Sequence, residues 1–157
     1  MAATAAFGKA LKAELVTAMQ SGGPMAAIDV CNTKAPGIAA AVSLQQGVQV
    51  SRVSLKNRNP DNAPSEWQTA VLESFEERVE SGEDAAGLSW QKTVEVDGVK
   101  HYRFMQAIPT GGVCLACHGK AIDPAVQAKL TELYPEDKAT GYSEGDLRGA
   151  FVVSRKL

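Results

Sequence analysis

The sequence predicts an α+β protein in which an antiparallel sheet is flanked by helices. Apolar residues recur at helical spacing near the N-terminus, and an Asp-Gly pair at 97–98 separates two strand-like stretches. A length of 157 residues, 45% of them hydrophobic and 22% charged, fits one globular domain over 1–157. The net charge of −2 offers no basic surface for nucleic acid. No apolar run reaches the roughly 20 residues that a membrane span needs.

Apolar spacing and turn residues define the elements of the first half. Leu11, Leu15 and Met19 recur at helical intervals, and Gly22-Gly23-Pro24 ends that helix. Pro36 lies inside the second predicted helix, which it should bend or restart. The predicted elements are an N-terminal helix at 4–20 within segment 1–22, a second helix at 24–45, a strand at 47–56 and a polar loop at 57–64.

Capping and turn residues define the second half in the same way. Ser65 is a predicted N-cap for a helix whose apolar stripe runs from Trp67 through Phe75. Asp97-Gly98 suits the positive φ angles of a two-residue hairpin, and Asp123-Pro124 is typical of a helix start. The predicted elements are a helix at 65–81, hairpin strands at 90–96 and 99–108, a helix that opens at 124 and a final strand at 149–154.

The motif Cys-Leu-Ala-Cys-His places Cys114, Cys117 and His118 at the spacing of a c-type haem attachment site. In that chemistry both thiols bond to the porphyrin and the histidine binds the iron. The alternatives are a thioredoxin-like redox pair, half a zinc site and chance. No βαβ pattern supports a redox pair, and only Cys31 and His101 remain as further cysteine or histidine ligands for zinc. The motif therefore predicts one covalent haem c.

Covalent haem attachment implies an exported protein, because haem is joined to such motifs outside the cytoplasm. We therefore expect a periplasmic, thylakoid-lumenal or extracellular location. The N-terminal segment carries Lys9 and Lys12 and lacks a basic start followed by an apolar run, so it does not have the pattern of a signal peptide. We interpret Met1 as a start that replaces a removed leader.

Several residues are candidates for the second axial position of the iron. Each also has a structural interpretation: methionines fill helix cores, a strand histidine forms a hydrogen bond, and a lone cysteine behaves as a small hydrophobe. The odd number of cysteines, three, leaves one thiol that iron ligation would protect in an oxidising compartment. A vacant site is the remaining alternative. The candidates are Cys31, His101, Met105, Met25 and Met19.

Haem carboxylates need cationic partners when they are buried. Each basic candidate also fits an ordinary solvated charge. The candidates are Lys56, Arg58, Arg103 and Arg148.

Separated segments of the chain resemble one bacterial family. They are 28–32 (Ile-Asp-Val-Cys-Asn), 54–67 (Ser-Leu-Lys-Asn-Arg-Asn-Pro-Asp-Asn-Ala-Pro-Ser-Glu-Trp), 103–109 with 114–119, and 145–151. Together they are similar to PAS-like c-type haem domains, which occur as small exported proteins in cyanobacteria and proteobacteria and as sensory regions ahead of signalling modules. The resemblance implies a PAS-like fold with His118 as the proximal ligand and Cys31 as the distal ligand.

This ligand pair leads to a functional expectation. A thiolate stabilises ferric iron, and its release on reduction would open a coordination site and move the N-terminal helices. We expect a non-enzymatic sensor of redox state or a diatomic gas, acting on an unidentified signalling or redox partner protein. The alternatives are an electron-transfer cytochrome and a haem enzyme such as a peroxidase, in which His101 and Arg103 would act at an open distal site.

Overall fold

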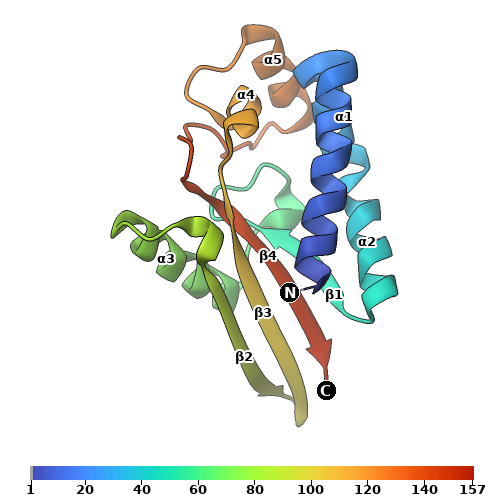
Figure 1. Ribbon diagram of the computed structural model, residues 1–157, viewed down its shortest axis with the longest axis vertical. Coiled ribbons are helices and arrows are strands. Elements are labelled where there is room, and N and C mark those ends of the chain that lie inside the picture. Colours follow the sequence, from blue (N-terminus) through green and yellow to red (C-terminus); the bar gives the residue numbers. More distant parts are fainter. Residues whose placement is uncertain (1) are drawn as a thin grey trace. The chain divides into compact units, whose positions relative to one another are not determined.

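A computed structural model describes residues 2–157 and shows an α+β protein with one four-stranded antiparallel sheet (Figure 1). The strand order in the sheet is β1-β4-β3-β2. This confirms the predicted fold class. The elements are α1 (Ala2–Thr33), α2 (Ala35–Gln46), β1 (Gln49–Val53), α3 (Glu66–Glu80), β2 (Ser89–Val96), β3 (Val99–Pro109), α4 (Leu115–His118), α5 (Pro124–Leu133) and β4 (Leu147–Lys156).

The chain forms two compact units. The first unit comprises the chain up to Ser51 together with Ser89–Gln106 and Phe151–Leu157. The second comprises Arg52–Leu88 and Ala107–Ala150. Strands β1, β3 and β4 therefore each contribute residues to both units. Within residues 2–157, no helix is both long and apolar enough to cross a membrane.

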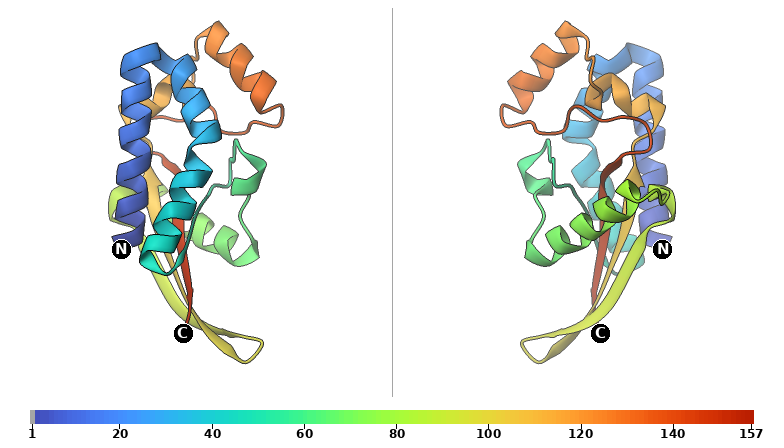
Figure 2. Two further views of the ribbon diagram at one scale, coloured as in Figure 1. Left: turned by 90° about the vertical axis from the view of Figure 1, so that its right-hand side faces the viewer. Right: turned by 90° about the vertical axis from the view of Figure 1, so that its left-hand side faces the viewer.

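Helices α1 and α2 belong to the first unit and are shaped by the residues that were expected to interrupt them. Gly23 has a non-helical conformation with φ of 65°, so α1 consists of two helices joined at a kink. Pro36 lies in the first turn of α2, where it restarts the helix as predicted. Figure 2 shows the chain turning back after the kink, so that α2 runs alongside the first part of α1. A 2.7 Å ion pair joins Lys34, the residue before α2, to Glu14 in the first part of α1.

The core of the first unit forms between these helices and the strands. Phe7 packs edge-to-face against Phe151, with ring centroids 5.3 Å apart. Burial of such aromatic and aliphatic side chains is the main source of the unit's stability. The buried residues of this core are Ala3, Phe7, Leu11, Val42, Val50, Phe104 and Val153.

The predicted hairpin forms from β2 and β3. Asp97 and Gly98 have φ angles of 51° and 75°, the positive values that a two-residue type I′ turn requires. The Tyr102 hydroxyl donates a 2.8 Å hydrogen bond to the Gln91 side chain across the pair. The antiparallel register is therefore fixed both by the turn and by side chains.

Local signals also set the helices of the second unit. Ser65 and Gln68 form a reciprocal capping box at the start of α3, and the Asp123 side chain caps α5. The apolar stripe of α3 buries Val71, Leu72 and Phe75. One expectation needs correction. Strand β1 ends at Val53, three residues before the predicted end, because a turn follows.

Truncating Leu72 should test the packing of the second unit. Its side chain is 0% exposed, so we expect Leu72→Ala to lower the free energy of unfolding by about 2–5 kcal/mol through lost burial and a cavity. Leu44 on α2 is 88% exposed, so Leu44→Ala should change the same quantity by less than about 0.5 kcal/mol. Urea denaturation of both variants measures the difference. Equal losses in the two variants would contradict this packing.

Candidate functional site

The Cys-Leu-Ala-Cys-His motif forms a helical turn in the second unit. Cys114 ends a 3-10 helix, Gly112–Cys114, and the following residues through His118 form α4. Residues three apart on a helical turn lie on the same face, so Cys114 and Cys117 present their thiols together. Both are half-buried, and none of the three cysteines of the chain is in a disulfide. The turn thus offers two reduced thiols beside an imidazole.

A second segment, residues 139–142, holds the end of this turn. The Tyr142 amide donates to the His118 carbonyl and the Gly141 amide donates to the Gly119 carbonyl, each at 2.9 Å. The Tyr142 ring also meets the His118 ring edge-to-face, with centroids 6.3 Å apart and planes at 88°. The backbone and the ring of His118 are therefore both held by this segment.

Gly119 closes the turn where no side chain fits. A Cβ at this position would lie 2.5 Å from the Leu115 carbonyl oxygen, which is a backbone atom. The Gly119 amide also donates to this oxygen, at 3.0 Å. The close approach of the two backbone segments requires glycine here.

Adding a methyl group to Gly119 should therefore loosen the turn. We expect Gly119→Ala to lower the free energy of unfolding by about 1–3 kcal/mol, because backbone atoms must shift to admit the Cβ. Gly37 in α2 has no atom within 4 Å of the equivalent position, so Gly37→Ala should be neutral or stabilise the protein by up to about 1 kcal/mol. Thermal denaturation compares the two variants. A Gly119→Ala protein as stable as Gly37→Ala would show that the turn has spare room.

The His118 imidazole is oriented by a backbone carbonyl. Its Nδ1 lies 2.7 Å from the Ala139 carbonyl oxygen. A carbonyl oxygen only accepts hydrogen bonds, so Nδ1 must carry a proton, and in the neutral ring Nε2 then carries the lone pair. Metal-binding histidines typically donate their other ring N–H in this way. The arrangement gives His118 the tautomer of an Nε2 metal ligand.

The electrostatics of the site favour the neutral ring. Burial is the largest cause, and with the nearby Arg148 and Arg58 charges it lowers the pKa of His118 to about 2. The hydrogen bond to Ala139 opposes this shift. The imidazole is therefore neutral at physiological pH, which is the form that binds a metal. Burial also lowers the pKa of Arg148 to about 10, which leaves it cationic.

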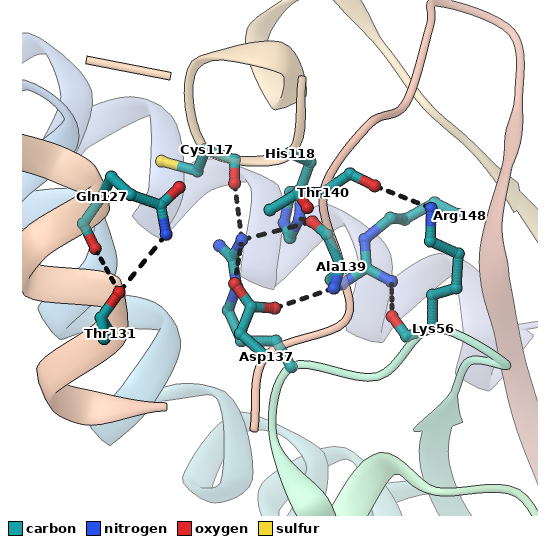
Figure 3. A network of polar contacts seen from close by, with 10 residues as sticks. Lys56, Cys117, His118, Gln127, Thr131, Asp137, Ala139, Thr140 and Arg148 are labelled. Atoms are coloured by element: carbon teal, nitrogen blue, oxygen red, sulfur yellow. Dashed lines mark hydrogen bonds and ion pairs between the residues drawn. The ribbon is translucent and has the colours of Figure 1, made fainter. Parts of the chain in front are cut away.

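Arg58 connects the motif to the segment that orients His118. Figure 3 shows Cys117, His118, Asp137 and Ala139 close together at this point. Its Nη2 donates to the Cys117 carbonyl at 2.6 Å and to the Ala139 carbonyl at 3.3 Å. The same nitrogen lies 3.0 Å from the Asp137 carboxylate, and the two side chains are only 11% and 8% exposed. Asp137 in turn accepts the Ala139 amide at 2.8 Å. Arg58 thus contacts the carbonyl oxygen that accepts the His118 hydrogen bond and also the carbonyl of Cys117, which precedes His118. Asp137 holds the amide of Ala139.

Lys56 and Arg148 lie beside Tyr142 in the same unit. The Lys56 ammonium donates to the Thr140 carbonyl at 2.7 Å and lies 4.4 Å from the centre of the Tyr142 ring. The Arg148 guanidinium lies 5.4 Å from that ring, and its Nη1 donates to the Ser54 hydroxyl at 3.0 Å. Of the four basic residues singled out from the sequence, three therefore lie in the unit that carries the motif: Lys56, Arg58 and Arg148.

The fourth basic residue and Cys31 belong to the first unit. Arg103 lies on β3 opposite Lys92 of β2. Cys31 is half-buried near the C-terminal end of α1. Both make contacts within the protein.

The other candidates for the second axial position also lie in the first unit. His101 is half-buried opposite Val94, whereas Met105 is 0% exposed opposite Trp90 and is a core residue. Met19 is half-buried. Met25 is 39% exposed, so it does not fill the helix core as expected, because it follows the kink in α1 directly.

Sequence reasoning missed the residues that orient His118. No functional residue was predicted between 135 and 146, yet this stretch supplies Asp137, the Ala139 carbonyl and Tyr142. A backbone acceptor has no signature in the side-chain sequence. Tyr142, as an aromatic residue in a polar loop next to Gly141, was the one available signal.

The donor set near the motif suits a bound haem. Two thiols share one face of a turn, and a neutral imidazole beside them keeps the Nε2 lone pair available. In the part of the chain that the structure describes, the buried Arg58 Nε, Thr110 Oγ1 and Asp137 Oδ2 make no hydrogen bond within the protein. Buried donors without partners are costly, so a polar group of a bound molecule would be favourable there. The residues present therefore fit a c-type haem.

Comparisons with known proteins agree with this description. A family model described as Tll0287-like matches residues 2–155. The crystal structure of the cyanobacterial heme-protein Tll0287 is similar, with a TM-score of 0.63 and 28% sequence identity over 79% of this chain and 70% of that chain. No curated protein matches the chain. The structural similarity is consistent with a PAS-like fold. Because the family model spans nearly the whole sequence, the chain belongs to the Tll0287-like family.

Proposed function

We propose that the protein carries one covalent haem c and senses redox state or a diatomic gas through a change of axial ligation. The observation that carries this proposal is the neutral His118 ring, whose Nδ1 proton is held by Ala139 beside two thiols on one turn. The similarity to a cyanobacterial heme-protein supports it. Haem would supply a redox-active iron with two axial positions.

The residues of the second unit would divide the work of holding the haem. Cys114 and Cys117 would hold the haem through thioether bonds, each formed by addition of the S–H across a vinyl C=C, with the hydrogen going to the neighbouring vinyl carbon. His118 would offer Nε2 to the iron, while the Ala139 carbonyl keeps the proton on Nδ1. The cationic side chains of Lys56, Arg58 and Arg148 are available to the haem carboxylates, with Arg103 as the candidate from the first unit.

Cys31 is proposed as the second axial ligand on chemical grounds. The Ile-Asp-Val-Cys-Asn segment resembles the family that uses such a cysteine, and the odd cysteine count leaves this thiol outside the attachment motif. A thiolate donates electron density and stabilises ferric iron. Protonation and release on reduction would vacate the site, which makes the ligand set a switch rather than a fixed scaffold.

The proposal includes a setting and a class of partner. Covalent attachment favours an exported compartment such as a periplasm or thylakoid lumen. A protein partner would respond to movement of the N-terminal helices in which Cys31 lies. We propose no catalysed reaction.

Carbon monoxide binding to the reduced protein tests the sensor against an electron carrier. A ligation switch predicts rapid formation of a carbon monoxide complex after reduction, with loss of the thiolate signature. An electron carrier needs six-coordinate iron in both states, so it would remain unchanged under carbon monoxide. A reduced spectrum that ignores carbon monoxide would overturn the sensor and favour the carrier.

A further inference from the structure

We infer that Arg58 and Asp137 are positioning residues that set the donor strength of His118 toward iron. The inference rests on the proposed function, because it assigns a role to residues behind the axial ligand. Neither side chain contacts the imidazole in the hydrogen bonds described. Both reach the imidazole through Ala139, whose carbonyl accepts from His118 and whose amide donates to Asp137.

The Ala139 carbonyl oxygen is shared by two donors. His118 Nδ1 lies at 2.7 Å and Arg58 Nη2 at 3.3 Å. The cationic donor draws electron density from the oxygen, so the oxygen pulls less on the Nδ1 proton. A weaker pull leaves the ring less electron-rich and Nε2 a poorer donor to iron. Arg58 thereby makes His118 a weaker donor to iron, and it also holds the Ala139 carbonyl in place.

Asp137 opposes this effect of Arg58. Its carboxylate lies 3.0 Å from Arg58 Nη2, and the exposed fractions of 8% and 11% mean that water screens the pair weakly. The carboxylate neutralises part of the guanidinium charge that Ala139 and a bound haem would feel. It also fixes the Ala139 peptide by accepting its amide at 2.8 Å. The Arg58–Asp137 pair therefore fixes the position of Ala139, and its two charges partly offset each other.

The two members of the pair should shift the haem midpoint potential in opposite directions. Arg58→Met removes a positive charge and the competing donor, and both changes favour ferric iron, so the potential falls. Asp137→Asn keeps an oxygen for the Ala139 amide but removes a negative charge, so the potential rises. If the pair only held the turn in place, either substitution would loosen the same turn. Both midpoint potentials would then move in the same direction.

Redox titration of the haem-loaded protein makes the comparison. At a fixed ambient potential, we expect the ratio of reduced to oxidised haem to fall by about threefold or more in Arg58→Met and to rise by about threefold or more in Asp137→Asn. Arg58→Lys retains the charge and should recover most of the loss. The matched control is the exposed Arg78–Glu83 ion pair of 2.6 Å in the same unit. Arg78→Met and Glu83→Gln should leave the ratio unchanged, because water and salt screen this pair.

A second measurement uses the apoprotein. In its proton NMR spectrum, the His118 Nδ1–H resonance should move downfield in Arg58→Met, because its hydrogen bond to Ala139 strengthens. An unmoved resonance, or titration shifts of the same sign in Arg58→Met and Asp137→Asn, overturns the inference. A wild-type protein that takes up no haem overturns the proposed function instead, and the NMR comparison still decides whether Arg58 acts on His118.

Discussion

Replacing both Cys114 and Cys117 with serine is expected to abolish covalent haem attachment while the fold remains intact. Serine preserves the size of the side chain but cannot form the thioether bond. The backbone bonds that hold the turn, from Tyr142 to His118 and from Gly141 to Gly119, do not involve the thiols. After maturation in an exporting host, haem retained through acid–acetone extraction should fall to less than about a tenth of the wild-type amount.

The third cysteine provides the control for this result. Cys31 lies on α1, outside the motif, so Cys31→Ala should retain its haem through the same extraction. Circular dichroism of each protein checks that the fold survives. Retention of haem by the double serine variant, or its loss from Cys31→Ala, would mean that the motif is not the attachment site.

The second large effect concerns Cys31 as the proposed second axial ligand. We expect Cys31→Ala to change the ferric low-spin EPR spectrum and to raise the midpoint potential, because a thiolate that stabilises ferric iron is lost. The reduced protein should change less, since under the proposed function the thiolate leaves the iron on reduction. EPR spectroscopy and redox titration of the variant measure both effects.

Variants of the competing candidates sharpen this test. His101→Asn and Met19→Leu should keep the wild-type ferric spectrum. Met105 is unsuitable as a control because its side chain is 0% exposed and its replacement would disturb the core. A wild-type spectrum in Cys31→Ala together with an altered one in His101→Asn would assign the ligand to the hairpin.

The parts of the fold that the sequence predicted well depend on local chemistry. Gly23 breaks α1, Pro36 restarts α2 and Asp97-Gly98 forms the hairpin turn, each because few residues suit those backbone angles. Burial was harder to predict. Met105 and Met25 have the same residue type, yet one is fully enclosed and the other exposed, because neighbours distant in sequence decide burial.

The candidate site also has one part that the sequence predicts and another that it does not. Cys114, Cys117 and His118 were recognisable because their chemistry requires a fixed spacing in sequence. The Arg58–Asp137 pair was not, since Arg58 lies 59 residues from the Cys117 carbonyl that it binds. A backbone carbonyl such as that of Ala139 could be supplied by any residue, so only the three-dimensional structure identifies it.

The intact mass of the wild-type protein under denaturing conditions tests the central claim most directly. After maturation in a host that attaches haem in an exported compartment, we predict a single species with the mass of the polypeptide plus one haem. The modification should map to the peptide that contains Cys114 and Cys117. A polypeptide of unmodified mass, with no haem or with haem released on unfolding, would contradict covalent attachment.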